Sequence, residues 1–320
     1  MELQTFVPID RPDFQIDYGT RMMFLGSCFV ENIGERLDYF RFSVDVNPCG
    51  IVYNPLSVAD TLEMLLEGQP LGVPDLWRHN GLWGSFRHHG RFSAPDAGEC
   101  LRKINTRLEE SASHLRQADL LVITWGTAWV YTRRAGGQVV SNCHKFPASD
   151  FLRRRLTVEE IVETYASLLE RVRERCPHIR VLLTVSPIRH WKDGAHGNQL
   201  SKAVLLLAAE RLTERFAFVS YFPSYEIVMD ELRDYRFYAD DLLHISSQGI
   251  LYIWERFRDH YITEEARALM KQVDKWKKIL LHRPSEPDSE ATLRLRAQAS
   301  EELLRLVRYP AWVSVSGLPE

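Results

Sequence analysis

The chain has 320 residues, of which 45% are hydrophobic and 26% charged, and its formal net charge at pH 7 is −3. These values are ordinary for a soluble globular protein with a sizeable core, and the small negative charge argues against a nucleic-acid partner. No apolar run approaches the roughly 20 residues that span a bilayer, and the N-terminus lacks a basic segment followed by an apolar one, so we expect no membrane span and a cytoplasmic location. The five irregularly spaced cysteines predict free thiols. Without a Cys-x-x-Cys or His-Glu-x-x-His pair we expect no metal, and no other cofactor is indicated.

A serine stands at the first strong structural signal of the chain. Residues 22–25 form an apolar run typical of a strand buried on both faces, Gly26 and Ser27 interrupt it, and helical spacing begins at Cys28. The turn places Ser27 beside the free N–H groups and the dipole of a helix N-terminus, where negative charge is favoured. Ser27 is therefore a candidate nucleophile beside its own oxyanion donors, or only the N-cap of the helix. If Ser27 faces a cleft, we expect Cys28 to be buried and turned back toward the sheet.

The next segment combines a short strand, a loop and an insertion. Residues 41–46 alternate as a half-buried strand, a loop with two Asn-Pro pairs contains Gly50, and residues 56–66 have helical spacing. Residues 73–95 mix aromatic residues, histidines and glycines without helical period, which predicts an inserted hairpin region. Trp83 and His89 of this insertion are candidates for a substrate wall over the serine. A metal at the adjacent histidines is less favoured, because no carboxylate or cysteine stands nearby at ligand spacing.

A second group of candidate residues follows the buried strand predicted over residues 119–124. That strand ends at Trp125 and Thr127, and a hairpin turned at residues 136–137 leads to Ser-Asn-Cys-His-Lys over residues 141–145. Asn142 and His144 bring an amide and an imidazole together here, and the less favoured alternative is that they only decorate a surface loop. Cys28 or Cys143 is an alternative nucleophile, but neighbours such as Cys143 and His144 point to opposite sides of a strand.

The remaining strands complete an α/β pattern. Residues 157–175 form a helix with a capping box, the strand over 179–185 leads to Arg189 and His190, and a helix over 198–216 precedes the strand over 216–222. Arg189 and His190 follow a strand, where α/β sheets place ligands, and are candidate substrate contacts. The basic run at residues 153–155 is interpreted as a solvated helix start. Five strands separated by helices predict a three-layer fold with a parallel sheet.

A carboxylate and a histidine stand just before the helix predicted over residues 248–261. Asp241 precedes His244 by three residues, a spacing at which a turn can fold the carboxylate under the imidazole Nδ1, whereas Asp240 is expected to face solvent. Ser27, Asp241 and His244 supply the serine, the aspartate and the histidine that a catalytic triad requires. Residues 263–320 are charged and helical and form a C-terminal extension. Such helices often pack on the body or on a second subunit, so a homodimer is a possible partner arrangement.

The motifs Gly-Ser-Cys-Phe-Val at residues 26–30 and Asp-x-x-His at residues 241–244 carry a resemblance to a known superfamily. Over about residues 6–261 the chain resembles the SGNH or GDSL-type hydrolases, and more closely the GSCFA family within them. The resemblance implies a flavodoxin-like order for the five-stranded sheet, in a hydrolase domain spanning residues 1–262. It also implies that Ser27 is the nucleophile, His244 the base and Asp241 the residue that orients the base.

The resemblance further implies an oxyanion hole and an activity. The hole would use the N–H groups of Ser27 and Gly50 and an asparagine amide, but the residue at the superfamily's asparagine position is Ala128. Asn142 is the favoured replacement and Thr127 the alternative. The implied function is a serine esterase or acyl hydrolase acting on a small-molecule or carbohydrate O-acyl ester. An acyltransferase with the same acyl-enzyme, or a ligand-binding relative without catalysis, is the alternative.

Overall fold

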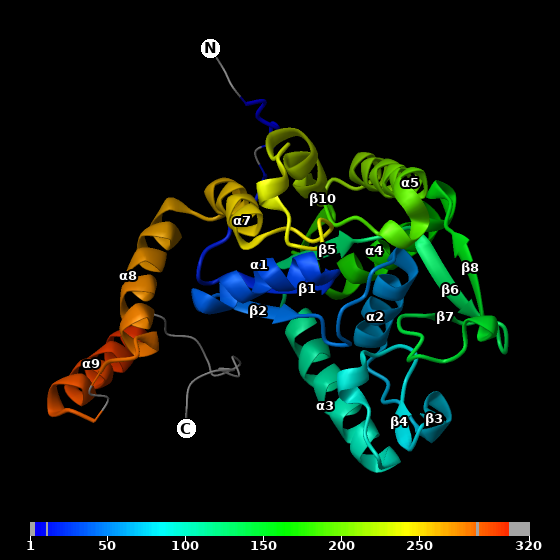
Figure 1. Cartoon of the computed structure of the whole chain (residues 1–320), viewed down its shortest axis with the longest axis horizontal. Coiled ribbons are helices and arrows are strands. Elements are labelled where there is room, and N and C mark those ends of the chain that lie inside the picture. Colours follow the sequence, from blue (N-terminus) through cyan, green and yellow to red (C-terminus); the bar gives the residue numbers. More distant parts are fainter. Residues whose placement is uncertain (1–3, 11, 286–287, 307–320) are drawn as a thin grey trace.

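The computed structural model describes residues 4–10, 12–285 and 288–306 of the chain. At its centre lies a parallel sheet of five strands in the order β10–β9–β5–β1–β2 (Figure 1). The strands are β1 (Arg21–Gly26), β2 (Ser43–Val46), β5 (Leu120–Trp125), β9 (Arg180–Val185) and β10 (Val219–Phe222). Each neighbouring pair is parallel, and helices connect the strands. The predicted flavodoxin-like α/β fold is confirmed.

Helices cover both faces of this sheet, and the alternation of side chains along β1 shows how. Met22 and Phe24 point to one face, while Met23 and Leu25 point to the other. The first face packs against α1 (Cys28–Tyr39) and α7 (Ser247–Tyr261). The second face packs against α2 (Pro55–Glu67), α3 (Ala97–Leu115), α4 (Val158–Arg175) and α5 (Gly194–Arg215). The carboxyl ends of the strands therefore open between two layers of helices.

Two small antiparallel sheets lie outside the central sheet. The predicted insertion contains a hairpin of β3 (Trp77–His79) and β4 (Leu82–Gly84). The hairpin expected at residues 136–137 is formed by β6 (Trp129–Arg133) and β7 (Val139–Val140), and β8 (Phe151–Arg155) pairs with the other edge of β6. The prediction of a helix start at residues 153–155 is wrong. Pairing with β6 makes this run a strand whose side chains alternate between the protein and solvent.

Two further helices, α8 (Glu264–Leu281) and α9 (Glu290–Leu306), follow α7. Ala266 and Met270 of α8 join the apolar cluster beside α1 and α7. Figure 1 shows the α8–α9 pair extending away from the sheet, at the opposite end of the molecule from β6 and β8. Residues 307–320 of the predicted extension lie outside the described residues. Within the described ranges, no helix is both long enough and apolar enough to cross a membrane.

Candidate active site

The turn after β1 presents Ser27. Gly26 has a φ of +138°, and a Cβ there would lie 2.1 Å from the carbonyl oxygen of Thr124, so only glycine fits. Ser27 occupies the N-cap position of α1, but its side chain makes no capping hydrogen bond. Its Oγ is buried and has no hydrogen-bond partner among the described residues. The helix-cap interpretation of Ser27 is therefore wrong, and the hydroxyl is left unpaired at the end of the strand.

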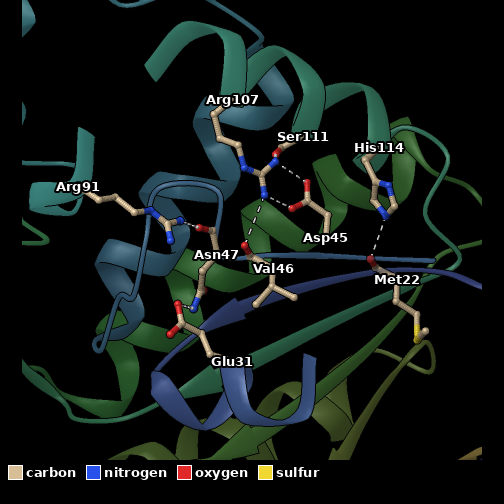
Figure 2. Close-up of polar contacts among 9 residues, drawn as sticks. All are labelled: Met22, Glu31, Asp45, Val46, Asn47, Arg91, Arg107, Ser111 and His114. Carbon is tan, nitrogen blue, oxygen red and sulfur yellow. Dashed lines mark hydrogen bonds and ion pairs between the residues drawn. The ribbon is translucent and has the colours of Figure 1, made fainter. Parts of the chain in front are cut away.

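Asn47 holds this turn from the loop after β2. Its side-chain oxygen accepts the N–H of Gly26 at 2.8 Å. Its Nδ2 donates to Glu31 of α1 at 3.4 Å (Figure 2). Its backbone oxygen accepts a hydrogen bond from Arg91 at 2.9 Å. Asn47 has a φ of +43°, in the left-handed region where asparagine is among the better tolerated residues. One buried side chain therefore couples the serine turn to the first turn of α1.

An ion pair fixes the strand that leads to Asn47. Arg107 of α3 pairs with Asp45 of β2, and the same guanidinium contacts Ser111 and the carbonyl of Val46 (Figure 2). Burial disfavours the charged form of Asp45, but the hydrogen bonds and charge of Arg107 outweigh it, so the pKa of this carboxyl lies below its ordinary value. The loop that supports the serine therefore starts from a well-anchored strand.

His244 and Asp241 form a pair on the loop before α7. The Asp241 Oδ2 lies 2.5 Å from the His244 Nδ1, and the other oxygen accepts the backbone N–H of His244 at 2.9 Å and that of Leu243 at 3.0 Å. These hydrogen bonds, first of all the one from the imidazole, lower the pKa of Asp241 to about 2. Leu242 adopts a φ of +58° to close this tight turn. Asp240 is exposed and makes no hydrogen bond to His244 within the described part of the chain.

A cleft of about 570 Å³ opens beside the turn that carries Ser27. Residues from several separate parts of the chain line it, among them the serine turn, the loops after β2 and β9, the β6–β7 hairpin region and the loop before α7. Seven of the predicted site residues are among them: Ser27, His89, Thr127, Asn142, Arg189, His190 and His244. The Ser27 Oγ makes no hydrogen bond to His244, so the hydroxyl and the imidazole line the same cleft without being hydrogen-bonded to each other.

The two backbone N–H groups predicted to bind the oxyanion, those of Gly50 and Ser27, instead donate to backbone carbonyls. The N–H of Gly50 donates to the Asn47 carbonyl at 2.8 Å, and Gly50 does not line the cleft. A Cβ at Gly50 would lie 2.2 Å from the His89 Cβ, so this glycine, with a φ of +88°, instead permits the close approach of His89. The N–H of Ser27 donates to the Thr124 carbonyl at 3.3 Å.

Three predicted substrate contacts also lie away from the cleft. Trp125 is completely buried, and its indole N–H donates to the Tyr165 hydroxyl at 2.9 Å. Trp83 is half-buried in the small hairpin and packs against the main core. The ring of His144 is turned to the Ser85 carbonyl, 2.8 Å from its Nε2. The sequence could not reveal these partners, because each lies at least 20 residues away along the chain or depends on tertiary packing.

Asn142 and Thr127 differ in how their polar groups are engaged. The Asn142 Oδ1 accepts the N–H of His144 at 2.8 Å, which leaves its Nδ2 as the group that can donate into the cleft. The Thr127 Oγ1 accepts the Trp129 N–H at 3.2 Å and lies 3.1 Å from the Ser201 Oγ. Ala128 is buried, and its N–H also donates to Ser201, so this position cannot present a side chain to the cleft.

Two cysteines line the cleft, contrary to the expectation that Cys28 is buried against the sheet. Cys28 is half-buried next to Ser27, and Cys143 stands next to Asn142. Burial raises the pKa of both thiols, and the charge of Glu31 raises that of Cys28 further. Both therefore remain thiols at neutral pH, a form that is a poor nucleophile.

A second imidazole and a buried lysine lie near the serine. A Cβ on Gly126 would lie 3.2 Å from the His190 Nε2 and 3.5 Å from the Ser27 Cβ, so His190 and Ser27 flank the same glycine. Burial, followed by the charges of Lys202 and Arg153, lowers the pKa of His190 to about 4. Lys202 is buried beneath the site and donates to the carbonyls of Gly126 and Ser186, both at 2.6 Å. It joins the ends of β5 and β9, and burial lowers its pKa to about 7.

The outer wall of the cleft was not predicted. Arg153 of β8 pairs with Asp193, and its guanidinium lies 4.2 Å from the ring centroid of Trp129. Lys192 donates to the hydroxyl of Tyr131 at 2.8 Å. Trp129 and Tyr131 are two residues apart in β6, and this spacing could have indicated that both side chains lie on the same face of the strand. No group of metal-binding side chains is present within the described ranges.

Residues 21–257 match the GSCFA family. No curated protein matches the chain. Among solved structures, a carbohydrate esterase family 3 from Talaromyces cellulolyticus has 10% identity and a TM-score of 0.37, over 80% of this chain and 99% of its own. The Clostridium thermocellum family 3 carbohydrate esterase has 11% identity and a TM-score of 0.36, over 78% of this chain and 98% of its own.

The family match spans most of the chain and contains both the serine turn and the loop that carries Asp241 and His244. This chain belongs to the GSCFA family.

Proposed function

We propose that the chain is a serine esterase that cleaves an O-acyl ester through Ser27, His244 and Asp241. The unpaired Ser27 hydroxyl carries this proposal. It is 2% exposed, has no hydrogen-bond partner among the described residues, and lines the same cleft as an imidazole oriented by a carboxylate. Leaving a buried hydroxyl unpaired costs about 1–3 kcal/mol, so the arrangement calls for a ligand or a reaction that uses the group.

The reaction would proceed through an acyl-enzyme. The Ser27 Oγ attacks the acyl carbonyl carbon while the His244 Nε2 takes the hydroxyl proton, and a tetrahedral oxyanion forms. When the intermediate collapses, the bond from carbon to the alcohol oxygen breaks and His244 returns the proton to that oxygen. Water then attacks the acyl-enzyme by the same two steps and releases the acid. Asp241 keeps the Nδ1 proton in place and stabilises the imidazolium.

His244, not His190, is assigned as the base. The carboxylate of Asp241 contacts the Nδ1 of His244, which leaves Nε2 free to receive a proton. His190 has no carboxylate partner among the described residues, and its pKa of about 4 makes it a weak base at neutral pH. The rim position of His244, whose side chain is 57% exposed, lets the ring turn toward the serine when substrate enters.

The oxyanion would be held by Asn142 and by the start of α1. Asn142 lines the cleft, and its Nδ2 is the amide group left to donate, because its Oδ1 already accepts a hydrogen bond from the N–H of His144. The first backbone N–H groups of a helix lack partners within the helix, and the helix dipole favours negative charge at that end. Since Ser27 occupies the N-cap position of α1, an oxyanion on its acyl group would form at this N-terminus.

A parallel screen of aryl acetates with the wild type, Ser27→Ala and Cys28→Ala tests the proposal. Loss of the nucleophile is expected to lower kcat by about 10⁴-fold or more, whereas Cys28→Ala should stay within about tenfold of wild type. Adding alcohols and amines as acceptors separates hydrolysis from acyl transfer, because transfer yields a new ester or amide in place of the free acid. Equal turnover by the wild type and Ser27→Ala would leave a ligand-binding relative as the better assignment.

A further inference from the structure

Two basic side chains of the cleft have no carboxylate partner among the described residues. Arg189 and Lys192 both belong to the loop between β9 and α5, on either side of His190, and both line the cleft. Most other basic residues in the cleft region have defined partners: Arg153 pairs with Asp193, and Lys202 is bound by two carbonyls. Arg189 and Lys192 are therefore the cationic groups that remain for a bound molecule.

The hydrogen-bond donors of the Arg189 guanidinium are poorly satisfied by the protein. The side chain is half-buried, and the acceptor that its Nη2 finds is the Met229 Sδ at 3.6 Å. A thioether sulfur is a weak acceptor, whereas a guanidinium carries five N–H donors in a planar fork that matches a carboxylate or a phosphate. Removing such a group partly from water without an anionic partner is unfavourable, and a bound anion would compensate for it.

Lys192 is held in place by β6. Its Nζ donates to the hydroxyl of Tyr131 at 2.8 Å and lies 5.3 Å from the centroid of the same ring. One of the three N–H groups of the ammonium is used in this way, and the others remain available. Tyr131 therefore positions a cation at the cleft wall without neutralising it.

The cleft contains too few carboxylates to balance its cations. Asp193 is the acidic residue that lines it, and its side chain is fully covered beneath Arg153. The positive charges also act at the floor of the cleft: those of Lys202 and Arg153 help to lower the pKa of His190, after burial. A concave site with an excess of one sign of charge concentrates ligands of the opposite sign.

We infer that Arg189 and Lys192 bind an anionic group, a carboxylate or a phosphate, of the substrate. The inference rests on the proposed function in taking that substrate to be an ester. Because both residues flank His190, which lies next to Gly126 and Ser27, the anionic group would be bound in the same cleft as the scissile ester. The substrate would thus be a small charged ester, and neutral esters would bind less well.

Three acetates that differ in one substituent test this inference. In 4-acetoxybenzamide the substituent is neutral, in 4-acetoxybenzoate it is a carboxylate, and in 4-acetoxyphenyl phosphate it is a phosphate. The measured quantity is the ratio of kcat/KM for each charged acetate to that for the amide. Comparing this ratio between variants cancels the intrinsic reactivities of the three esters, and comparing the two charged acetates separates carboxylate from phosphate recognition.

The variant is R189Q/K192Q, and its control is R171Q/K271Q, which removes the same charge outside the cleft. We expect R189Q/K192Q to lower the charged-to-neutral ratio by about tenfold or more, mainly through KM, while the control keeps the wild-type ratio. Raising NaCl from about 0.05 M to about 0.5 M should lower the ratio of the wild type and leave that of R189Q/K192Q nearly unchanged. An equal ratio in the wild type and R189Q/K192Q would overturn the inference.

A binding measurement tests the anionic subsite independently of whether the protein is an esterase. Calorimetry with Ser27→Ala requires no turnover, and we expect it to bind both charged acetates more tightly than the amide. A triple variant that combines Ser27→Ala with R189Q and K192Q should show no such difference in affinity. If Ser27→Ala binds charged and neutral acetates equally, the anionic subsite is wrong. If the charged acetates bind selectively but are never hydrolysed by the wild type, the subsite stands and the esterase proposal fails.

Discussion

Asp241 holds His244 at two points: one carboxylate oxygen lies 2.5 Å from the imidazole Nδ1, and the other accepts the backbone N–H of the same residue at 2.9 Å. The neighbouring Asp240 makes no hydrogen bond to His244 within the described chain. We therefore expect Asp241→Asn to lower kcat by about tenfold to a thousandfold, because the amide no longer selects the required tautomer. Asp240→Asn is the matched control and should retain nearly full activity. Equal losses in the two variants would show that the carboxylate has been misassigned.

His244 and His190, which both line the cleft, should differ in chemical rescue. His244→Gly removes an exposed base at the rim, and added imidazole can diffuse into the space that it leaves. We expect turnover to fall by about 10⁴-fold or more and to recover partly with millimolar imidazole. His190→Gly should lose less activity and gain nothing from imidazole, because a side chain with a pKa of about 4 does not serve as the base. Rescue of His190→Gly alone would reverse the assignment.

Variants at Asn142 and Thr127 should distinguish a residue that donates to the oxyanion from a hydroxyl that only supports the fold. We expect Asn142→Ala to lower kcat by about 10²–10³-fold with a small change in KM, as for loss of one oxyanion donor. Thr127→Val removes the acceptor of the Trp129 N–H, so it should lower the free energy of unfolding by about 1–3 kcal/mol while kcat changes little. Steady-state kinetics and chemical denaturation of both variants give the comparison. The opposite pattern would place Thr127, not Asn142, in the hole.

Acid should destabilise the protein through a buried histidine. His88 is 1% exposed, neither ring nitrogen has a partner among the described residues, and burial lowers its pKa to about 3. The unfolded chain takes up this proton near pH 6.5 and the folded chain only near pH 3, so stability is lost as the pH falls through this interval. Between pH 7 and about pH 5 the contribution is about 2 kcal/mol.

His88→Phe should therefore show a smaller loss of unfolding free energy over that pH range than the wild type. His178→Gln, at an exposed position, serves as the control and should behave like the wild type. Urea denaturation at both pH values measures the difference. The same acid dependence in His88→Phe and the wild type would show that this imidazole is not held neutral by the fold.

The sequence predicted the strands and the motifs that carry Ser27 and His244 better than the residues that surround them in the cleft. Apolar runs and helical spacing identified the five strands, and the serine turn and Asp-x-x-His are local patterns whose geometry a few residues determine. The contact of Trp125 with Tyr165 and the pairing of Arg153 with Asp193 join residues 40 apart in the chain, so no local signal reveals them. Gly50 was assigned by its order in the chain, but its N–H was already committed to Asn47.

Acylation of Ser27 can be detected most directly by intact-protein mass spectrometry after acid quenching. During turnover of an aryl acetate, we predict an adduct of one acetyl group, mapped to Ser27 by peptide analysis and absent from Ser27→Ala. Cys28→Ala should carry the same adduct, since burial keeps the Cys28 thiol protonated at neutral pH. Acylation of Cys28 or Cys143 with an unmodified Ser27, or turnover by Ser27→Ala at the wild-type rate, would show that Ser27 is not the nucleophile.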